Sequence, residues 1–214
     1  MKIFYYTFIA FFLIKCNSLP VSEEVVHPSL DATYSKSLSI GNKFIYSFNS
    51  IAGTSLIVKE VIKDTVINNK EYAVMLREFK RTVDDIINTR IVYERADTLC
   101  LYNYYLDADY EVLIFNFSWS TSDTIPRIFN DIWCRYGRYS VTNSDSSMIF
   151  NEICQRIEIY SNRDDSINRV TFHRPFGITY DLRQQDVGNV EIITLEGAII
   201  NGTVFGKNES EIMK

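Results

Sequence analysis

The sequence predicts an all-β domain, and three observations support that prediction. Tyr and Phe each occur 14 times among the 214 residues, alongside many Ile, Val and Thr residues. Aromatic and β-branched side chains favour strands because they fit a pleated, half-buried surface. The β-prone runs are separated by short polar turns rather than by crossover helices, so neighbouring strands are expected to pair antiparallel. We therefore expect an antiparallel meander of about ten strands, curled into a half-barrel or a two-layer arrangement, with room for one short helix.

The N-terminus predicts export. Residues 3–14 (IFYYTFIAFFLI) form an unbroken apolar run after Lys2, too short to cross a bilayer as a helix but typical of a signal peptide. Small residues then place a cleavage site after Ser18, so residues 1–18 are expected to be a signal peptide. The mature chain is accordingly expected in the periplasm, on the cell surface or outside the cell.

Cys16 offers an alternative to simple cleavage. A cysteine between an apolar run and a polar stretch is also the acylation site of a bacterial lipoprotein, although Lys15 is unusual in the position before it. Acylation of Cys16 would anchor the protein to the outer membrane. The sequence leaves the two routes open.

The rest of the chain divides into three parts. Residues 19–36 are polar and patternless and are expected to be a flexible leader, residues 37–206 a single β domain, and residues 207–214 a disordered tail. The domain opens with alternation that places Phe44, Tyr46 and Phe48 on one face of a strand. Further β-prone runs cover residues 55–67, 71–79, 90–95, 98–106, 110–118, 139–143, 147–160, 168–174, 178–182, 191–194 and 198–205.

Turn chemistry connects several of these runs. Asn68-Asn69-Lys70 predicts a hairpin between residues 55–67 and 71–79, and residues 107–109 predict another turn. Residues 124–133 instead show helical spacing, with Thr124 as a potential N-cap and Pro126 near the first turn. Two short strands would produce the same pattern, and the sequence does not separate the two interpretations.

Five short segments carry a further signal: residues 41–46 (GNKFIY), 63–72 (KDTVINNKEY), 93–98 (YERADT), 176–180 (FGITY) and 195–202 (LEGAIING). They resemble motifs of a group of exported β-rich proteins from the Bacteroidota, Ignavibacteria and Chlorobi. The resemblance covers roughly residues 38–206. The resemblance implies that the protein is located in the cell envelope or outside the cell, and it implies no activity and no catalytic residue. Many members of the group carry a type IX sorting domain after the β domain, and residues 207–214 show no such pattern, so the resemblance leaves the export route open.

The cysteines allow two interpretations. After signal removal Cys100, Cys134 and Cys154 remain, an odd number that permits one intramolecular disulfide. We expect Cys134 to pair with Cys154 if a disulfide forms, and the alternative is three buried thiols that act as small apolar side chains.

Motifs for catalysis and cofactors are missing from the sequence. The two histidines, His27 and His173, fit no zinc pattern, and no GxSxG, P-loop or GxGxxG occurs. The net charge of −5, from 22 basic and 27 acidic residues mixed along the chain, argues against a nucleic-acid partner. We expect no metal, no cofactor and no enzymatic activity. The acidic side chains Asp107, Asp109 and Glu111 lie on one side of an extended segment and provide the pair of carboxylates that a glycoside hydrolase would need.

Aromatic residues in the middle of the chain provide the main functional signal. Tyr102, Tyr104, Trp119 and Trp133 would contact a ligand if they were exposed on a concave sheet, whereas burial would make them core residues. We expect an exported, non-catalytic protein that binds an apolar ligand or an envelope partner on the concave face of its sheet. The alternative is a structural or adhesive module that recognises polysaccharide, and a carboxylate-based hydrolase ranks last.

Overall fold

The computed structural model describes residues 37–121, 123–129, 134–163, 166–185 and 189–213, all within the compact unit that begins at Ala32. The predicted signal peptide, the leader, Cys16 and Trp133 lie outside these residues. The first half of the domain contains β1 (Lys43–Ser50), β2 (Gly53–Ile67), β3 (Lys70–Lys80), β4 (Ile86–Ala96), β5 (Cys100–Tyr105), the 3-10 turn η1 (Leu106–Ala108) and β6 (Tyr110–Asn116). The second half contains β7 (Thr124–Phe129), β8 (Cys134–Ile149), β9 (Glu152–Arg163), β10 (Ser166–His173), β11 (Gly177–Gln185), β12 (Asn189–Ile200), β13 (Thr203–Gly206) and the helix α2 (Glu209–Ile212).

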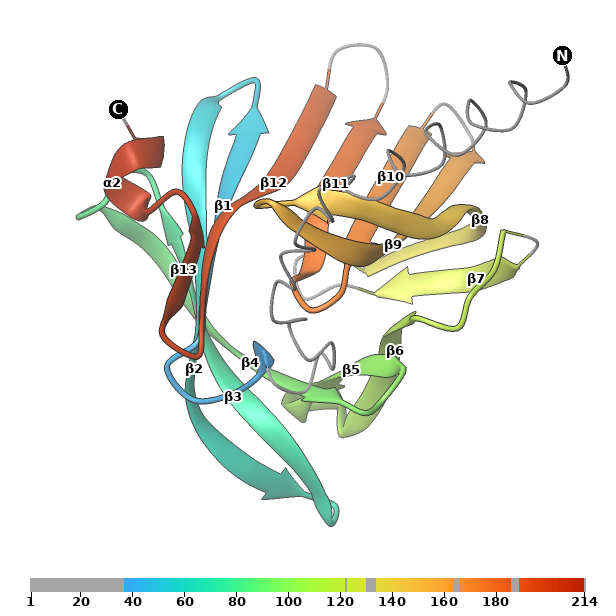
Figure 1. Cartoon of the computed structure of the whole chain (residues 1–214), viewed down its shortest axis with the longest axis horizontal. Helices are drawn as coiled ribbons and strands as arrows, with labels where there is room; N and C mark the ends of the chain where they lie inside the picture. Colours follow the sequence, from blue (N-terminus) through green and yellow to red (C-terminus); the bar gives the residue numbers. More distant parts are fainter. Residues whose placement is uncertain (1–36, 122, 130–133, 164–165, 186–188, 214) are drawn as a thin grey trace, which may run out of the picture. The chain divides into compact units, whose positions relative to one another are not determined.

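All thirteen strands belong to one antiparallel sheet (Figure 1). The strands β1 to β6 form one meander and β7 to β12 form a second, and β1 pairs with β12 to join them, giving the order β6-β5-β4-β3-β2-β1-β12-β11-β10-β9-β8-β7. β13 pairs with the end of β12, and the sheet does not close. The structure therefore confirms the all-β antiparallel prediction. It has more strands than expected, in part because the predicted runs 147–160 and 198–205 each divide between two strands.

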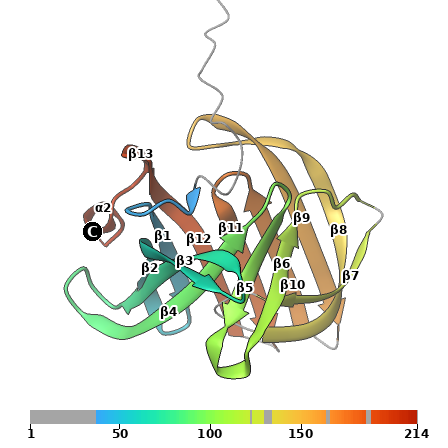
Figure 2. The same cartoon turned by 90° about the horizontal axis from the view of Figure 1, so that it is seen from below.

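The sheet curls so that its two halves face each other. The ring of Phe115 on β6 stacks on Phe172 of β10, with 3.7 Å between ring centroids, although seven strands lie between β6 and β10 in the order of the sheet. Gln155 on β9 donates a hydrogen bond to the carbonyl of Phe117 at 3.0 Å, and the Arg174 guanidinium lies over the Phe117 ring. Figure 2 shows β5 and β6 in front of β10 and β11. The concave face is therefore a packed interior, which fits the predicted two-layer arrangement.

Both faces of β1 are buried, which the predicted alternation did not require. Phe44 and Tyr46 lie on one face as expected, but Ile45 between them is only 3% exposed. Ile45 packs with Leu56 and Val58 of β2, and this second face is covered by Ile212 and Met213 at the C-terminus. A strand that is covered on both sides has no need for alternating polarity.

Residues 207–213 of the C-terminal tail are ordered, which corrects the prediction of a disordered tail for these residues, and Lys214 lies outside the described residues. Asn208 caps α2: its side chain accepts a hydrogen bond from the Glu211 backbone N–H at 3.1 Å, and the Glu211 side chain accepts one from the Asn208 N–H at 2.8 Å. Glu209 pairs with Lys80 at 2.8 Å and with Lys43 at 3.8 Å. The tail was expected to be disordered because a short segment in which six of eight residues are polar rarely orders alone, but it folds here by covering an apolar face with Ile212 and Met213.

Residues 124–129 form a strand, so the helical interpretation of this segment is wrong. β7 pairs with β8 from Thr124 opposite Ser140 to Phe129 opposite Cys134, and the register shifts between Ile125 and Arg127, at Pro126. Proline has no N–H to donate to the ladder and is tolerated at such bulges. The long neighbouring strand outweighs the weak helical spacing, because a short helix has little intrinsic stability.

The predicted turns are confirmed where the structure describes them. Asn68 and Asn69 have positive φ angles of 50° and 60°, as the two-residue hairpin between β2 and β3 requires. Asp109 also has a positive φ angle of 50° and ends η1 between β5 and β6. Within the described residues, no helix combines the length and the apolar character of a membrane-spanning segment.

The C-terminal tail can pack against β12 because position 197 is a glycine. A Cβ atom at Gly197 on β12 would lie 1.9 Å from the Lys207 carbonyl oxygen, whereas one at Gly202 would meet nothing within 4 Å. Gly197→Ala should therefore displace the tail and lower the free energy of unfolding by about 2–3 kcal/mol. Gly202→Ala, which introduces only backbone strain at a φ of 80°, should cost about 1 kcal/mol. Urea unfolding of the two variants would test this, and equal losses would contradict it.

Candidate functional site: a pocket beside β2, β3 and β4

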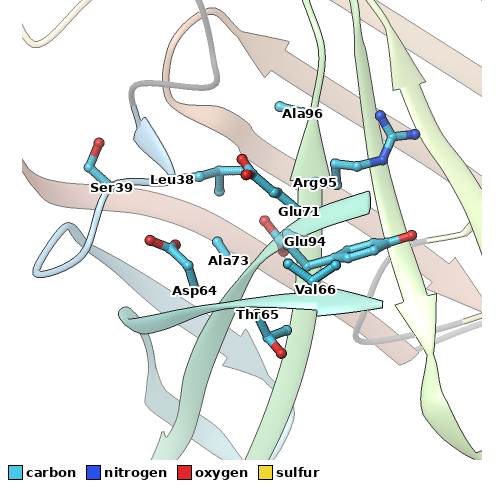
Figure 3. A pocket seen from close by; sticks show the side chains of 11 residues that line it. Leu38, Ser39, Asp64, Thr65, Val66, Glu71, Ala73, Glu94, Arg95 and Ala96 are labelled. Carbon is cyan, nitrogen blue, oxygen red and sulfur yellow. The ribbon is translucent and has the colours of Figure 1, made fainter. Parts of the chain in front are cut away.

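The described part of the chain contains a pocket of about 480 Å³ beside the β2–β3 hairpin and the end of β4 (Figure 3). This volume lies in the range of small-molecule sites. The lining residues are Leu38, Ser39, Asp64, Thr65, Val66, Glu71, Tyr72, Ala73, Glu94, Arg95 and Ala96. Leu38, Tyr72 and Ala73 are buried, at 8%, 3% and 6% exposure, so the pocket has an apolar floor with charged groups around it.

Strand register brings the β-strand residues of the pocket together. Asp64 on β2 lies opposite Ala73 on β3, and Ala73 lies opposite Glu94 on β4. Side chains that are directly opposite in an antiparallel ladder share one face of the sheet. Asp64, Ala73 and Glu94 therefore lie on one face of three adjacent strands, whereas the lining residues Thr65, Tyr72 and Arg95 start from the opposite face.

The segment before β1 supplies the remaining wall. Leu38 and Ser39 precede Gly41, whose positive φ of 84° allows its N–H to donate to the Val61 carbonyl at 2.8 Å. Asn42 is 2% exposed; its side-chain amide donates to the Ser37 carbonyl at 3.1 Å, and its side-chain oxygen accepts the Asn201 N–H at 2.8 Å. The Gly-Asn pair of the 41–46 segment thus holds Leu38 and Ser39 against β2 and β3.

A buried ion pair lies behind the pocket. The Lys59 ammonium on β2 donates to the Glu94 carboxylate, and the two residues are 8% and 2% exposed. Burying a charge is costly unless an opposite charge compensates for it. Lys59 therefore neutralises the Glu94 carboxylate in the wall of the pocket.

A second network holds Arg95 at the other side of the pocket. Glu111 on β6 accepts hydrogen bonds from Arg95 at 2.8 Å, from the Tyr72 hydroxyl at 2.7 Å and from Lys70 at 2.6 Å. The Arg95 guanidinium also lies 4.0 Å from the centroid of the Tyr102 ring, a cation–π contact. Four strands, β3 to β6, contribute to this arrangement, which we call the Glu111 network: Lys70, Tyr72, Arg95, Tyr102 and Glu111.

The Glu111 network shifts the pKa values of its members. Burial alone would raise the pKa of Glu111, but the hydrogen bonds from Arg95, Lys70 and Tyr72 outweigh it and lower this pKa to about 2. Burial, with the adjacent Glu111 carboxylate, raises the pKa of Tyr72 to about 12. The hydrogen bond to Glu111 raises the pKa of Arg95 further. At neutral pH, Glu111 is therefore ionised and neutralises Arg95.

Two carboxylates of the pocket are left without such a counterion. Asp64 and Glu71 are exposed at its mouth, and neither forms an ion pair with a residue that the structure describes. Figure 3 shows both carboxylates toward Leu38 and the Arg95 guanidinium on the opposite side. Since Lys59 compensates Glu94 and Glu111 compensates Arg95, the mouth carries net negative charge.

The aromatic residues predicted as ligand contacts do not form one exposed surface. Tyr104 is 6% exposed and its hydroxyl bonds Asp109. Trp119 packs edge-on against Phe115, with 5.1 Å between ring centroids. Tyr102 is half-buried and supports Arg95 without lining the pocket. Of the three that the structure describes, Tyr102 alone belongs to the candidate site, and only through Arg95.

The paired carboxylates considered for glycoside hydrolysis also serve separate purposes. Asp109 accepts a hydrogen bond from Tyr104, Glu111 holds Arg95, and Asp107 is exposed in η1. Within the described residues, no three His, Cys, Asp or Glu side chains gather into a metal site. The pocket residues Tyr72, Glu94 and Arg95 were missed at the sequence level, because partners such as Tyr72 and Glu111 are far apart in the chain.

The disulfide between Cys134 and Cys154 does not form in this structure. Cys154 is a free, buried thiol whose pKa is raised by burial to about 11, and Cys100 is a second free thiol. Cys154 lies opposite Ser147 near the end of β8, whereas Cys134 begins that strand. Strand geometry thus separates the two by far more than the few ångströms that a disulfide spans.

Comparisons with known proteins add a likeness of fold. The sequence matches no protein-family model and no curated protein. A candidate exported protein with a YmcC-like fold from Bacteroides fragilis superposes with a TM-score of 0.47 at 9% identity, over 75% of this chain and 96% of that one. A candidate lipoprotein from Parabacteroides distasonis gives a TM-score of 0.47 at 7% identity, over 81% of this chain and 99% of that one. Likeness at this level says nothing about a shared function.

The Glu111 network predicts a specific response to acid. Because the pKa of Glu111 is about 2 in the folded protein and about 4.5 when unfolded, the unfolded state binds more protons between these values. The free energy of unfolding should fall as the pH drops from about 4.5 to about 2, by at most about 3 kcal/mol from this group. Glu111→Gln should remove this part of the acid dependence.

Urea unfolding across the pH range checks this. Glu111→Gln should also lose roughly 1–3 kcal/mol at neutral pH, because Arg95 loses its counterion. The control Glu71→Gln, at an exposed position, should retain the wild-type profile. An unchanged acid dependence in Glu111→Gln would show that the network does not set it.

Proposed function

We propose that this chain is an exported protein whose pocket beside β2, β3 and β4 binds a small amphiphilic cation without chemistry at that pocket. The observation that carries the proposal is a pocket of ligand size whose floor is apolar and whose mouth carries two carboxylates without an ion-pair partner among the described residues. The apolar part of the ligand would contact Leu38, Tyr72 and Ala73. Its positive group would face Asp64 and Glu71.

Export is part of the proposal because of residues 1–18, where a basic residue and a short apolar run precede a cleavage site. The pocket itself is proposed to bind rather than to catalyse because the groups that line it fit binding better than chemistry. Its polar members are carboxylates, hydroxyls and one guanidinium, and both Glu94 and Arg95 are engaged by Lys59 and Glu111. The compensated groups Glu94 and Arg95 would help to orient a ligand, while Asp64 and Glu71 would select its charge.

The pocket refines the ligand expected from the sequence. An apolar ligand on the concave face was expected because β5 and β6 are apolar on both sides, but the packing of Phe115 on Phe172 fills that part of the interior. The space that remains is at the side of β2 to β4, where the lining mixes apolar and acidic groups. An apolar body with a cationic head fits this lining better than a neutral lipid, because opposite charge favours binding and like charge opposes it.

A pair of matched surfactants would test the proposal. Decyltrimethylammonium and decyl sulfate have the same alkyl chain and opposite head groups, and both would be titrated below micellar concentration into the mature protein by calorimetry. We expect the cation to bind at least about tenfold more tightly, a difference of about 1.4 kcal/mol. Equal binding of the two, or binding of neither, would contradict the proposal.

Charge-removing variants would show whether the preference for the cation comes from the pocket. Asp64→Asn combined with Glu71→Gln should weaken binding of the cation by about tenfold while leaving the fold intact, because both side chains are exposed. Asp84→Asn combined with Asp85→Asn, in the exposed turn before β4, makes the same change in net charge away from the pocket and should leave the affinity unchanged. An equal loss in both double variants would assign the effect to net charge alone.

A further inference from the structure

A hydroxyl, an imidazole and a second hydroxyl lie in a row across β8, β10 and β11, apart from the pocket. The Ser147 Oγ lies 2.6 Å from Nε2 of His173, and Nδ1 of His173 lies 2.6 Å from the Thr179 Oγ1. The register explains the contact: Ser147 lies opposite Cys154 on β9, and His173 lies opposite Arg156 on the same strand. Because Ser147 and His173 are far apart in the sequence, no local motif predicts their contact.

The direction of the hydrogen bonds follows from the last member of the row. Thr179 donates its hydroxyl proton to the Thr171 carbonyl at 3.3 Å, and a carbonyl can only accept. The Thr179 oxygen is then the acceptor for Nδ1–H of His173. This places the imidazole proton on Nδ1, leaves Nε2 as an acceptor, and requires Ser147 to donate its hydroxyl proton to Nε2.

The surroundings keep the imidazole neutral and hold it in place. His173 is 7% exposed and Thr179 is 5% exposed, whereas Ser147 is half-buried and reaches solvent. Burial lowers the pKa of His173 to about 4; the nearby Arg156 also lowers it and Asp145 opposes the shift. Arg156 is fixed by two hydrogen bonds to Asp145, at 2.8 and 2.7 Å. A neutral base that is oriented by a third group, within hydrogen-bond reach of an accessible hydroxyl, is the arrangement of an activated nucleophile.

We propose that Ser147 is a nucleophile that accepts an acyl group from a carboxylic ester, with His173 as its general base and Thr179 as a positioning residue. Ser147 Oγ forms a bond to the carbonyl carbon, and its proton passes to Nε2 of His173. The carbon–oxygen bond to the alcohol then breaks, and the alcohol leaves with the proton from Nε2. The products are the Ser147 ester and the free alcohol.

Covalent labelling of the intact mature protein would test this inference. The probe is an alkyl fluorophosphonate, which transfers its phosphonyl group to an activated serine hydroxyl with loss of fluoride. We expect one added phosphonyl mass, located at Ser147 by peptide mapping, and a stoichiometric release of nitrophenolate from p-nitrophenyl acetate. No labelling of the folded wild type, or labelling that maps elsewhere, would overturn the proposal.

Matched variants separate a reactive centre from a structural hydrogen-bond row. Ser147→Ala should abolish labelling, and Ser146→Ala, the neighbouring serine on the opposite face of β8, should label at the wild-type rate. His173→Gln should slow labelling by about 100-fold or more, as expected for loss of a general base. Thr179→Val removes the oxygen that accepts the hydrogen bond from Nδ1–H of His173. The proton is then no longer held on Nδ1, so labelling should slow while its site stays at Ser147.

Unfolding midpoints in urea show that each variant is folded. If a His173 variant is too unstable to assay, Ser147→Ala against Ser146→Ala still decides the question, because Ser147 is half-buried and is not one of the buried core residues. Equal labelling rates in these two serine variants would overturn the proposal. Because the row shares no residue with the pocket, neither result depends on whether the pocket binds a cation.

Discussion

β1 and β12 lie far apart in the chain, and their antiparallel pairing joins the two meanders into one sheet. The pairing extends from Lys43 opposite Ile199 to Asn49 opposite Ile192, with a bulge between Ile45 and Tyr46. Bringing β1 and β12 together closes a long loop of chain, and this closure costs conformational entropy. The apolar side chains Phe44 and Ala198, which face each other across this pair and are both 1% exposed, help to offset that cost.

The same pairing determines where the C-terminus lies. β12 continues beyond its pairing with β11 and there accepts β13, which returns the chain to Gly197 and places α2 over the outer face of β1 and β2. Ile212 and Met213 then cover Ile45, Leu56 and Val58. The C-terminal residues are thus a structural part of the domain, held by steric fit, one capping box and ion pairs to Lys43 and Lys80.

Curling of the sheet creates an interior that contains charge as well as apolar groups. Phe115 stacks on Phe172 in the middle of it, while the pairs Lys59–Glu94 and Arg183–Asp181 are also buried in the domain. Buried ion pairs contribute little net stability because desolvation offsets their attraction. The retention of the Lys59–Glu94 pair beside the pocket is consistent with a role in selecting what binds there. The row formed by Ser147, His173 and Thr179 is a separate polar feature, built by register on β8, β10 and β11.

Local chemistry in the sequence was sufficient to predict the strand content, the hairpin at Asn68 and Asn69, and the antiparallel order of neighbouring strands. These features depend on side-chain shape, turn preference and short connections, and each of these can be recognised from a few consecutive residues. The apolar alternation of Phe44, Tyr46 and Phe48 was likewise visible, although the burial of Ile45 between them was not.

Only the tertiary structure decided the rest. The pairing of β1 with β12, the order of the C-terminal tail and the strand at residues 124–129 depend on partners distant in the chain, and they override weak local preferences. The candidate sites follow the same rule. Glu111 meets Arg95 and Tyr72, and Ser147 meets His173, through strand register alone. The sequence by itself determined which segments become strands, whereas their pairing determined which side chains meet, because a contact across a sheet depends on which strands are neighbours and how they align.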